Sequence, residues 1–244
     1  VRVTAQLIDA ETGHHVWAEK YDRDLEDIFD LQDEMVQLIA GALEPEINAF
    51  ERQLAVRKPP GNLDAWEQYQ RGLWHMWIYD NENVTIAMDL LRKSIKADSS
   101  FAPAHAYFAY CCYITVVLGY VEDPKTRLAE GMTAARMALK CDDKDAISHF
   151  AIGRILMMQG KHDAAINSLQ RSIELNPCFA HAYHGLGFAL GLAGELEKSK
   201  KTTGIAINIS PRDPMLFAFY SVHCLTCVLD GENEEGLEWA QRAV

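Results

Sequence analysis

Two pairs of side chains have the spacing that metal-binding or redox chemistry would use. His181 and His184 lie three residues apart, so on a helix their imidazoles share one face, which is the minimum geometry for two metal ligands. Cys224 and Cys227 form a C-x-x-C motif with the same spacing. A zinc or redox centre would also need a third ligand, a second C-x-x-C or a helix N-terminus beside the thiols, and the sequence indicates none. Packing inside a helical array is the competing interpretation for both pairs.

No other motif predicts a catalytic or cofactor site. The glycine-rich stretch at 185–194 lacks G-x-G-x-x-G spacing and follows no predicted strand. No phosphate loop, G-x-S-x-G or H-E-x-x-H is present. An acidic run between Asp22 and Asp27 is typical of a solvated surface. We therefore expect no active site, no cofactor and no bound metal in this chain.

An internal repeat predicts the elements that position these side chains. A set of marked residues recurs after 34 positions. The first copy holds Gly153, Gly160, Ala165, Leu169 and Pro177, and the second holds Gly187, Gly194, Ser199, Thr203 and Pro211. A fixed period of this length is typical of stacked helix–turn–helix units, none of which can bury its apolar face alone.

Each marker has a physical reason. Gly153 and Gly187 fall in mid-helix, where glycine costs roughly 1 kcal/mol against alanine, so close packing should require them. Gly160 and Gly194 end the first helix of each unit, where a left-handed backbone is needed. The terminal prolines cannot continue a helix and force the turn into the next unit.

The stretch "AIGRILMMQGKHDAAINSLQRSIELNP" resembles the tetratricopeptide repeat. The resemblance implies a mainly α fold, a right-handed α-α superhelix that binds protein segments in its concave groove. Imperfect copies extend the array over 63–244, as about four full units and a truncated fifth. The second unit is about ten residues longer, and we expect these residues to form a loop broken by Pro124. Because the stack ends without a polar cap, either the chain is cut there or further repeats follow Val244, and the sequence leaves both open.

The resemblance also nominates a groove. In this family, positions 2, 5, 9 and 12 of each unit point from the first helix into the concave face. Counted from Ala65, Ala102, Ala146, Ala180 and Pro214, with a less certain register in the first unit, they predict an aromatic and apolar partner-binding groove of Trp66, Tyr69, Trp77, Tyr110, Tyr113, Phe150, Arg154, Met157, His181, His184, Phe188 and Val222. Such a surface suits an amphipathic helix or an extended apolar segment. Burial between repeats is the alternative for each residue.

Composition excludes several function classes. The 244 residues carry 23 Lys and Arg against 35 Asp and Glu, a net charge of −12. Nucleic acid and anionic membranes are therefore poor partners. The longest apolar stretch, Phe108 to Val121, is too short to span a bilayer. Six cysteines without disulfide-framework spacing suit a reducing compartment, so we expect a cytoplasmic protein.

The first 56 residues have a different pattern. Alternation from Val1 to Ile8, a turn with Gly13 at positive φ, and a returning run from His15 to Tyr21 predict a β-hairpin. A helix is predicted from an Asp30 N-cap, with a kink or second helix at Pro45. The segment 57–62, "RKPPGN", reads as a linker. Since a lone hairpin is marginally stable, residues 1–56 look like the end of a larger α/β domain.

These residues resemble the end of the TolB-like domain of large bacterial signalling proteins. The matching residues are Gln6, Leu7, Asp9, Gly13, Trp17, Ala18, Tyr21, Asp22, Ile28, Phe29, Gln32 and Asp33. In those proteins this domain follows an output domain, either a class III adenylate or guanylate cyclase or a winged-helix DNA-binding domain, and precedes tetratricopeptide repeats. The resemblance implies a cytoplasmic regulator and brings no cyclase activity to this chain.

Three hypotheses follow. The first is a protein-interaction and regulatory module of a cyclase-like or winged-helix signalling protein, whose groove binds a peptide, a helix or a segment of the same protein. The second is a scaffold that makes its parent a homo-oligomer, because the strand edge near Val1 and the uncapped end near Val244 favour self-association. The third is a metal or redox enzyme that uses the histidines or the C-x-x-C.

Overall fold

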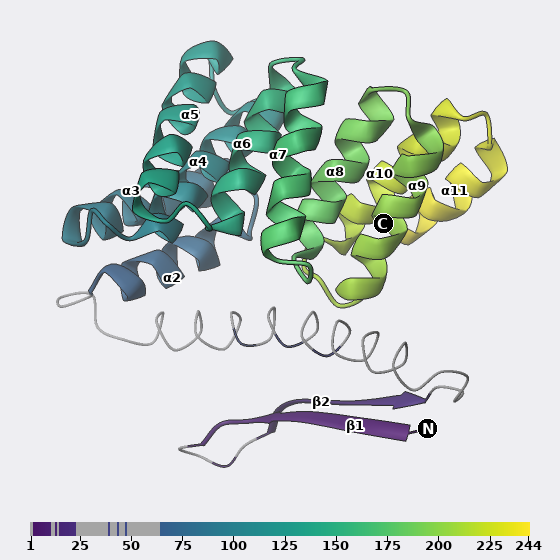
Figure 1. Ribbon diagram of the computed structural model, residues 1–244, viewed down its shortest axis with the longest axis horizontal. Helices are drawn as coiled ribbons and strands as arrows, with labels where there is room; N and C mark the ends of the chain where they lie inside the picture. The colour runs from purple at the N-terminus through teal and green to yellow at the C-terminus, as the bar shows by residue number, and fades with distance from the viewer. Residues whose placement is uncertain are drawn as a thin grey trace.

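The computed structural model describes residues 2–10, 13, 15–22, 39, 43, 47 and 64–244. An antiparallel hairpin comes first, followed by a row of antiparallel helix pairs (Figure 1). The elements are β1 (Arg2–Ile8), β2 (His15–Asp22), α2 (Ala65–Met76), α3 (Asn81–Ala97), α4 (Ala102–Val117), α5 (Pro124–Cys141), α6 (Ala146–Met158), α7 (His162–Leu175), α8 (Ala180–Leu192), α9 (Leu196–Ile209), α10 (Leu216–Leu229) and α11 (Asn233–Arg242).

The predicted hairpin is confirmed. Strand β1 pairs with β2 from Arg2 opposite Asp22 to Ile8 opposite His15, with an irregularity next to Leu7. Gly13 adopts the expected positive φ of 72° in the connecting turn. The predicted helix from Asp30, the kink at Pro45 and the linker at 57–62 lie outside the described residues, apart from the helical residues 39, 43 and 47.

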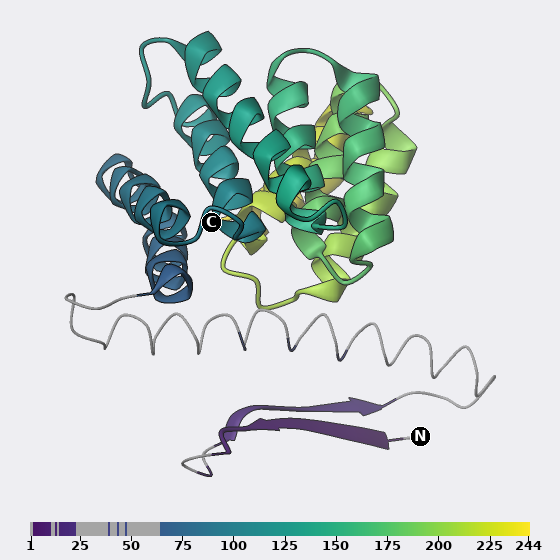
Figure 2. The ribbon, with the colours of Figure 1, turned by 60° about the vertical axis from the view of Figure 1, so that its left-hand side comes forward.

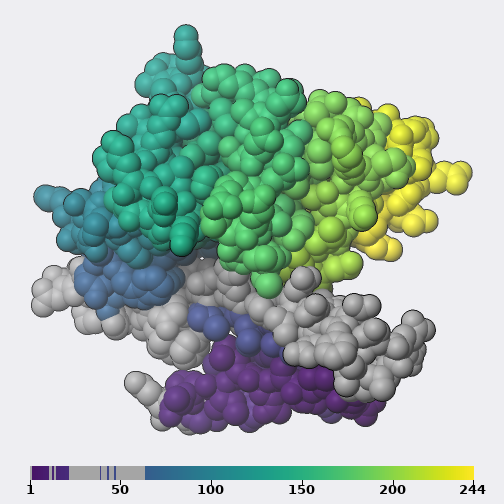
Figure 3. Space-filling model, viewed as in Figure 1, coloured from purple at the N-terminus to yellow at the C-terminus, as the bar shows by residue number. Residues whose placement is uncertain are grey.

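The helices pack as pairs, α2 with α3 through to α10 with α11, and α4, α6, α8 and α10 also contact one another in succession. Figure 2 shows the row curving, and Figure 3 shows successive pairs joined into one continuous surface on the face in view. One core cluster of buried side chains runs from Tyr69 in α2 to Leu190 in α8. The predicted helical-repeat architecture is therefore confirmed.

Glycine has the two roles predicted for it. Gly160 and Gly194 end their helices with φ of 71° and 82°. A Cβ added at Gly153 would lie 2.5 Å from Cγ of Leu169, and one at Gly187 would lie 2.4 Å from Cγ2 of Thr203. The paired helices can approach this closely only because glycine occupies these positions.

The expectation of a ten-residue loop in the second unit is wrong. Helix α4 has 16 residues against 13 in α6, and α5 has 18 against 14 in α7. The added residues therefore mostly extend both helices. Pro124 does not break a helix but begins α5, where a missing N–H costs nothing. The Asp123 side chain caps this helix by accepting a hydrogen bond from the Thr126 backbone N–H at 3.1 Å.

Candidate partner-binding cavity

The first helices of the later pairs line an open apolar cavity of about 440 Å³. Its walls come from α4, α6, α8 and α10, with one residue from the α2–α3 connection. The lining residues are Tyr79, Tyr110, Tyr113, Ile114, Val117, Leu118, Arg154, His184, Phe188, Met215, Phe217, Ala218, Ser221, Val222 and Leu225. The volume is in the range of ligand-binding pockets.

The structure brings half of the nominated groove residues together in this cavity. They are Tyr110, Tyr113, Arg154, His184, Phe188 and Val222. The others lie elsewhere. Phe150, Met157 and Tyr69 are core residues with 2%, 3% and 6% exposure. Trp66 is 45% exposed and its ring packs against Tyr69.

The two remaining nominated residues, Trp77 and His181, contact each other and do not line the cavity. The ring centroid of Trp77 lies 4.9 Å from that of His181, so the end of α2 contacts the start of α8 across the curve of the array. His181 also bonds Oδ2 of Asp213 through Nε2 at 3.0 Å. This contact occupies the region beside the N-terminus of α8. The cavity lies next to this filled region, and its wall includes His184 of the same helix.

The sequence analysis did not nominate several of the lining residues, although the repeat count points to some of them. The count from Pro214 that nominated Val222 also points to Met215, Ala218 and Leu225, all of which line the cavity. Val117 belongs to the extended C-terminal turn of α4, which a standard repeat length does not predict.

Tyr79 had no sequence signal. It adopts a positive φ of 61°, which is strained for a residue with a Cβ and is often found where a site is held in place. The Tyr120 hydroxyl donates to the Tyr79 carbonyl at 3.1 Å, and the Tyr79 and Tyr110 hydroxyls lie 3.3 Å apart. These contacts hold the phenol in the cavity wall.

Arg154 places a positive charge in this apolar wall. It is 4% exposed. Its Nη2 donates to the Tyr113 hydroxyl, and its guanidinium lies over the Tyr113 ring, 4.5 Å from the centroid. Nε and Nη1 have no hydrogen-bond partner. Among the described residues no carboxylate forms an ion pair with it.

The neighbouring titratable groups are held neutral. Burial, the Arg154 charge and His181 lower the pKa of His184 well below 6.5, although a backbone hydrogen bond to Ala218 acts in the opposite direction. Burial raises the pKa of Tyr110 to about 12. The wall around Arg154 therefore supplies no negative charge at neutral pH.

The shift at His184 predicts a pH dependence of stability. Its folded pKa is depressed, so below pH 6.5 the unfolded chain binds a proton that the folded chain does not. The free energy of unfolding should fall between pH 7 and pH 5, and His181 acts in the same direction. Carboxyls whose pKa is lowered in the folded state, such as that of Asp80, change the stability only near and below pH 3.8. Urea unfolding at both pH values measures the change. In a His184→Phe variant, the free energy of unfolding should fall by less between these two pH values. An equal fall would contradict the assignment of the pH dependence to His184.

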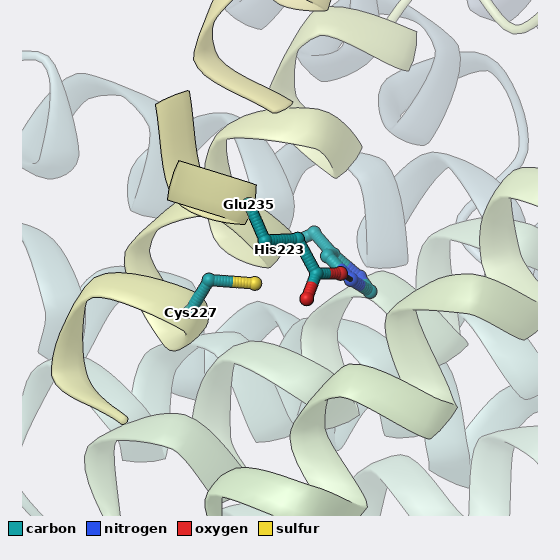
Figure 4. A group of neighbouring side chains, drawn as sticks. All are labelled: His223, Cys227 and Glu235. Atoms are coloured by element: carbon teal, nitrogen blue, oxygen red, sulfur yellow. Dashed lines mark ion pairs between the residues drawn. The ribbon is translucent and has the colours of Figure 1, made fainter. Parts of the chain in front are cut away.

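A second cluster of chemistry-bearing side chains lies in the last helix pair. His223 and Cys227 of α10 and Glu235 of α11 offer donor atoms that all lie within 4.8 Å of one another (Figure 4). Cys227 of the C-x-x-C therefore lies next to His223 and Glu235. Burial raises the pKa of the Cys227 thiol to about 11, and burial lowers the pKa of His223 against the opposing charge of Glu235. A metal bound here would have to displace the proton of the thiol.

These shifts predict the order of thiol reactivity. Burial raises the pKa of Cys112 to about 12 and that of Cys111 well above 9.0, while Cys141 is exposed. Because the thiolate is the nucleophile, a disulfide reagent at pH 7.5 should modify Cys141 quickly and Cys111, Cys112 and Cys227 only on unfolding. Cys141→Ser should remove the fast phase. A fast phase that persists and maps to Cys227 would contradict the prediction.

Comparisons with known proteins identify the type of array. Residues 153–194 match the family model described as TPR repeat. TTC0263, a thermophilic TPR protein of Thermus thermophilus, is 14% identical with a TM-score of 0.57, covering 84% of this chain and 99% of that one. The pilF protein of Pseudomonas aeruginosa is 16% identical with a TM-score of 0.53, covering 81% and 78%. The likeness shows the fold, a tetratricopeptide-type helical solenoid.

One curated relative is a bacterial protein. The protein named Putative adenylate cyclase 3, of Rhizobium meliloti (strain 1021), is 28% identical over 165 residues. The match covers 68% of this chain and 28% of that protein, so the chain spans less than a third of this relative. Within the part of the chain that the structure describes, no helix is long and apolar enough to cross a bilayer.

Proposed function

We propose that this chain is a protein-interaction and regulatory module whose cavity receives an apolar segment of a protein. The observation that carries the proposal is the 440 Å³ apolar cavity with an apolar rim. Of its lining residues, Val117, Phe217 and Leu225 are 43%, 48% and 40% exposed. Contiguous exposed apolar surface around a concave site is typical of interaction surfaces.

The relative supports a setting for this module. Likeness to a protein named as an adenylate cyclase, together with the resemblance of 1–56 to the end of a TolB-like domain, favours a cytoplasmic bacterial signalling protein of the nucleotide cyclase type. Residues 63–244 would then form the interaction region and 1–56 the end of the preceding domain. A segment of the same protein would be a suitable occupant, because binding it would couple the cavity to an output domain.

Site-specific cross-linking tests the proposal. A photoreactive phenylalanine at Ser221, an exposed lining residue, should form cross-links that map to one segment of a partner or of the full-length protein. The same group at Met137, which is 41% exposed on α5 outside the cavity, is the matched control. Tyr113→Ala and Phe188→Ala should reduce the Ser221 cross-link. Equal labelling from both positions would argue against the cavity.

Self-association is a second candidate, favoured by the last helix pair. Val228, Leu229 and Leu237 are 49%, 53% and 61% exposed there. Exposed apolar side chains on a pair of helices form a surface where a second copy can pack. Light scattering should show a dimer that a Leu229→Lys, Leu237→Lys variant converts to a monomer. A monomer at all workable concentrations would dispose of this candidate.

A further inference from the structure

We infer that the cavity recognises one acidic side chain set between apolar side chains of the bound segment, and that its carboxylate pairs with Arg154. The inference rests on the proposed function, because it takes the cavity as the place where a protein segment binds. It adds the chemistry of that segment. Among the described residues no carboxylate meets the guanidinium, so a bound segment can supply its counter-ion.

The first argument is the unsatisfied state of Arg154. The side chain is 4% exposed, and Nε and Nη1 lack hydrogen-bond partners while Nη2 donates to Tyr113. A buried charge without a counter-ion is unfavourable, because burial removes part of its hydration. Such groups are rare in folded proteins, and a role in binding is one reason for a protein to keep one.

The second argument is that the local packing makes room for the guanidinium. A Cβ at Gly185 would lie 3.2 Å from Cδ and 3.5 Å from Nη1 of Arg154, as well as 2.9 Å from Leu169. Glycine within helix α8 is unfavourable by itself. The aromatic faces of Tyr113 and Phe188, at 4.5 and 5.8 Å from the guanidinium carbon, hold the charge at the cavity wall.

The third argument concerns the remaining walls. Apart from Arg154, polar groups lining the cavity are tyrosine hydroxyls, the neutral His184 and Ser221. Hydroxyls can donate to a carboxylate, and a guanidinium binds carboxylates more strongly than any neutral group. The rest of the lining is apolar and fits aliphatic side chains on either side of that carboxylate.

A protein segment fits better than a small free acid. Val117, Leu118, Phe217 and Leu225 are 40–48% exposed and extend the apolar surface outward from the cavity. The walls span four first helices, α4, α6, α8 and α10. A molecule that filled only the cavity would leave this rim in water, whereas neighbouring side chains of a peptide would cover it.

The test compares two peptides. Both are acetylated and amidated helical peptides with leucines four positions before and after a central residue, which is glutamate in one and glutamine in the other. Titration followed by fluorescence anisotropy should show the glutamate peptide binding at least about tenfold more tightly, as a charge-assisted hydrogen bond in a buried site requires. Arg154→Met should remove the difference between the peptides and Arg154→Lys should restore part of it. Arg171→Met, on the exposed face of α7, is the matched control.

The outcomes separate this inference from the proposed function. If both peptides bind equally and Phe188→Ala weakens both, the cavity binds apolar segments and carboxylate recognition is overturned. If neither peptide binds but octanoate does, and octanamide does not, the site takes a small acid and the inference is overturned. If nothing binds and Ser221 gives no specific cross-link, the proposed function fails as well. The inference is supported if the glutamate peptide binds more tightly than the glutamine peptide and this difference in affinity disappears in Arg154→Met.

Discussion

Replacing Gly187 with alanine should lower the free energy of unfolding by about 2 kcal/mol or more, at the upper part of the range for overpacking a core. The new Cβ would lie 2.4 Å from Cγ2 of Thr203 and 3.3 Å from the Ser199 carbonyl oxygen. Thr203 cannot rotate away freely, because Oγ1 donates to the Ser199 carbonyl at 3.0 Å and lies 2.8 Å from Nδ1 of His223. Helices α8 and α9 would have to separate, against a gain of only about 1 kcal/mol in helix propensity.

The chain offers a matched control for this substitution. Gly204 lies in α9, next to Thr203, and a Cβ there would meet nothing within 4 Å. Gly204→Ala should therefore raise the free energy of unfolding by about 1 kcal/mol. Denaturant titrations of both variants give the comparison. Similar effects of the two substitutions would show that helix propensity, and not the contact between α8 and α9, decides the stability at Gly187.

The helix pairs were predictable because their signals are local. A turn glycine such as Gly160 and a mid-helix glycine such as Gly153 report the backbone conformation and the spacing of two helices close in sequence. The expected loop around Pro124 was wrong for a related reason. A period measured between markers gives the length of a unit, but it does not show whether added residues extend helices or a connection. Proline is equally suited to breaking a helix and to beginning one.

The cavity was predictable only in part, because its geometry depends on contacts between distant residues. Phe150 and Phe188 both occupy groove positions in the repeat count. Phe150 is 2% exposed and packs against Tyr110, whereas Phe188 lines the cavity. The contact of Trp77 with His181, 104 positions along the chain, helps decide which part of the concave side stays open. No local pattern reports such a contact, and none predicts Tyr79 at positive φ.

Arg154→Met should stabilise the free protein, by about 1–2 kcal/mol. Methionine keeps the apolar stem that packs in the wall and removes a buried charge whose Nε and Nη1 have no partner. The lost interactions are a hydrogen bond to Tyr113 and cation–π contacts with Tyr113 and Phe188, each worth roughly 1 kcal/mol or less. The midpoint of thermal unfolding should rise by about 2–4 °C per kcal/mol for a chain of this size.

A second measurement distinguishes removal of the charge from better packing. The Arg154 charge lowers the pKa of both His184 and His181, so in Arg154→Met both histidines should titrate at higher pH by NMR. The control Arg171→Met changes an exposed ion pair with Glu174 and should alter stability by less than about 0.5 kcal/mol. If Arg154→Met is less stable than this control, the guanidinium is already compensated in the free protein, and the reason to expect an acidic ligand disappears. If it is more stable and also loses the glutamate peptide, the protein keeps an unfavourable charge because binding uses it.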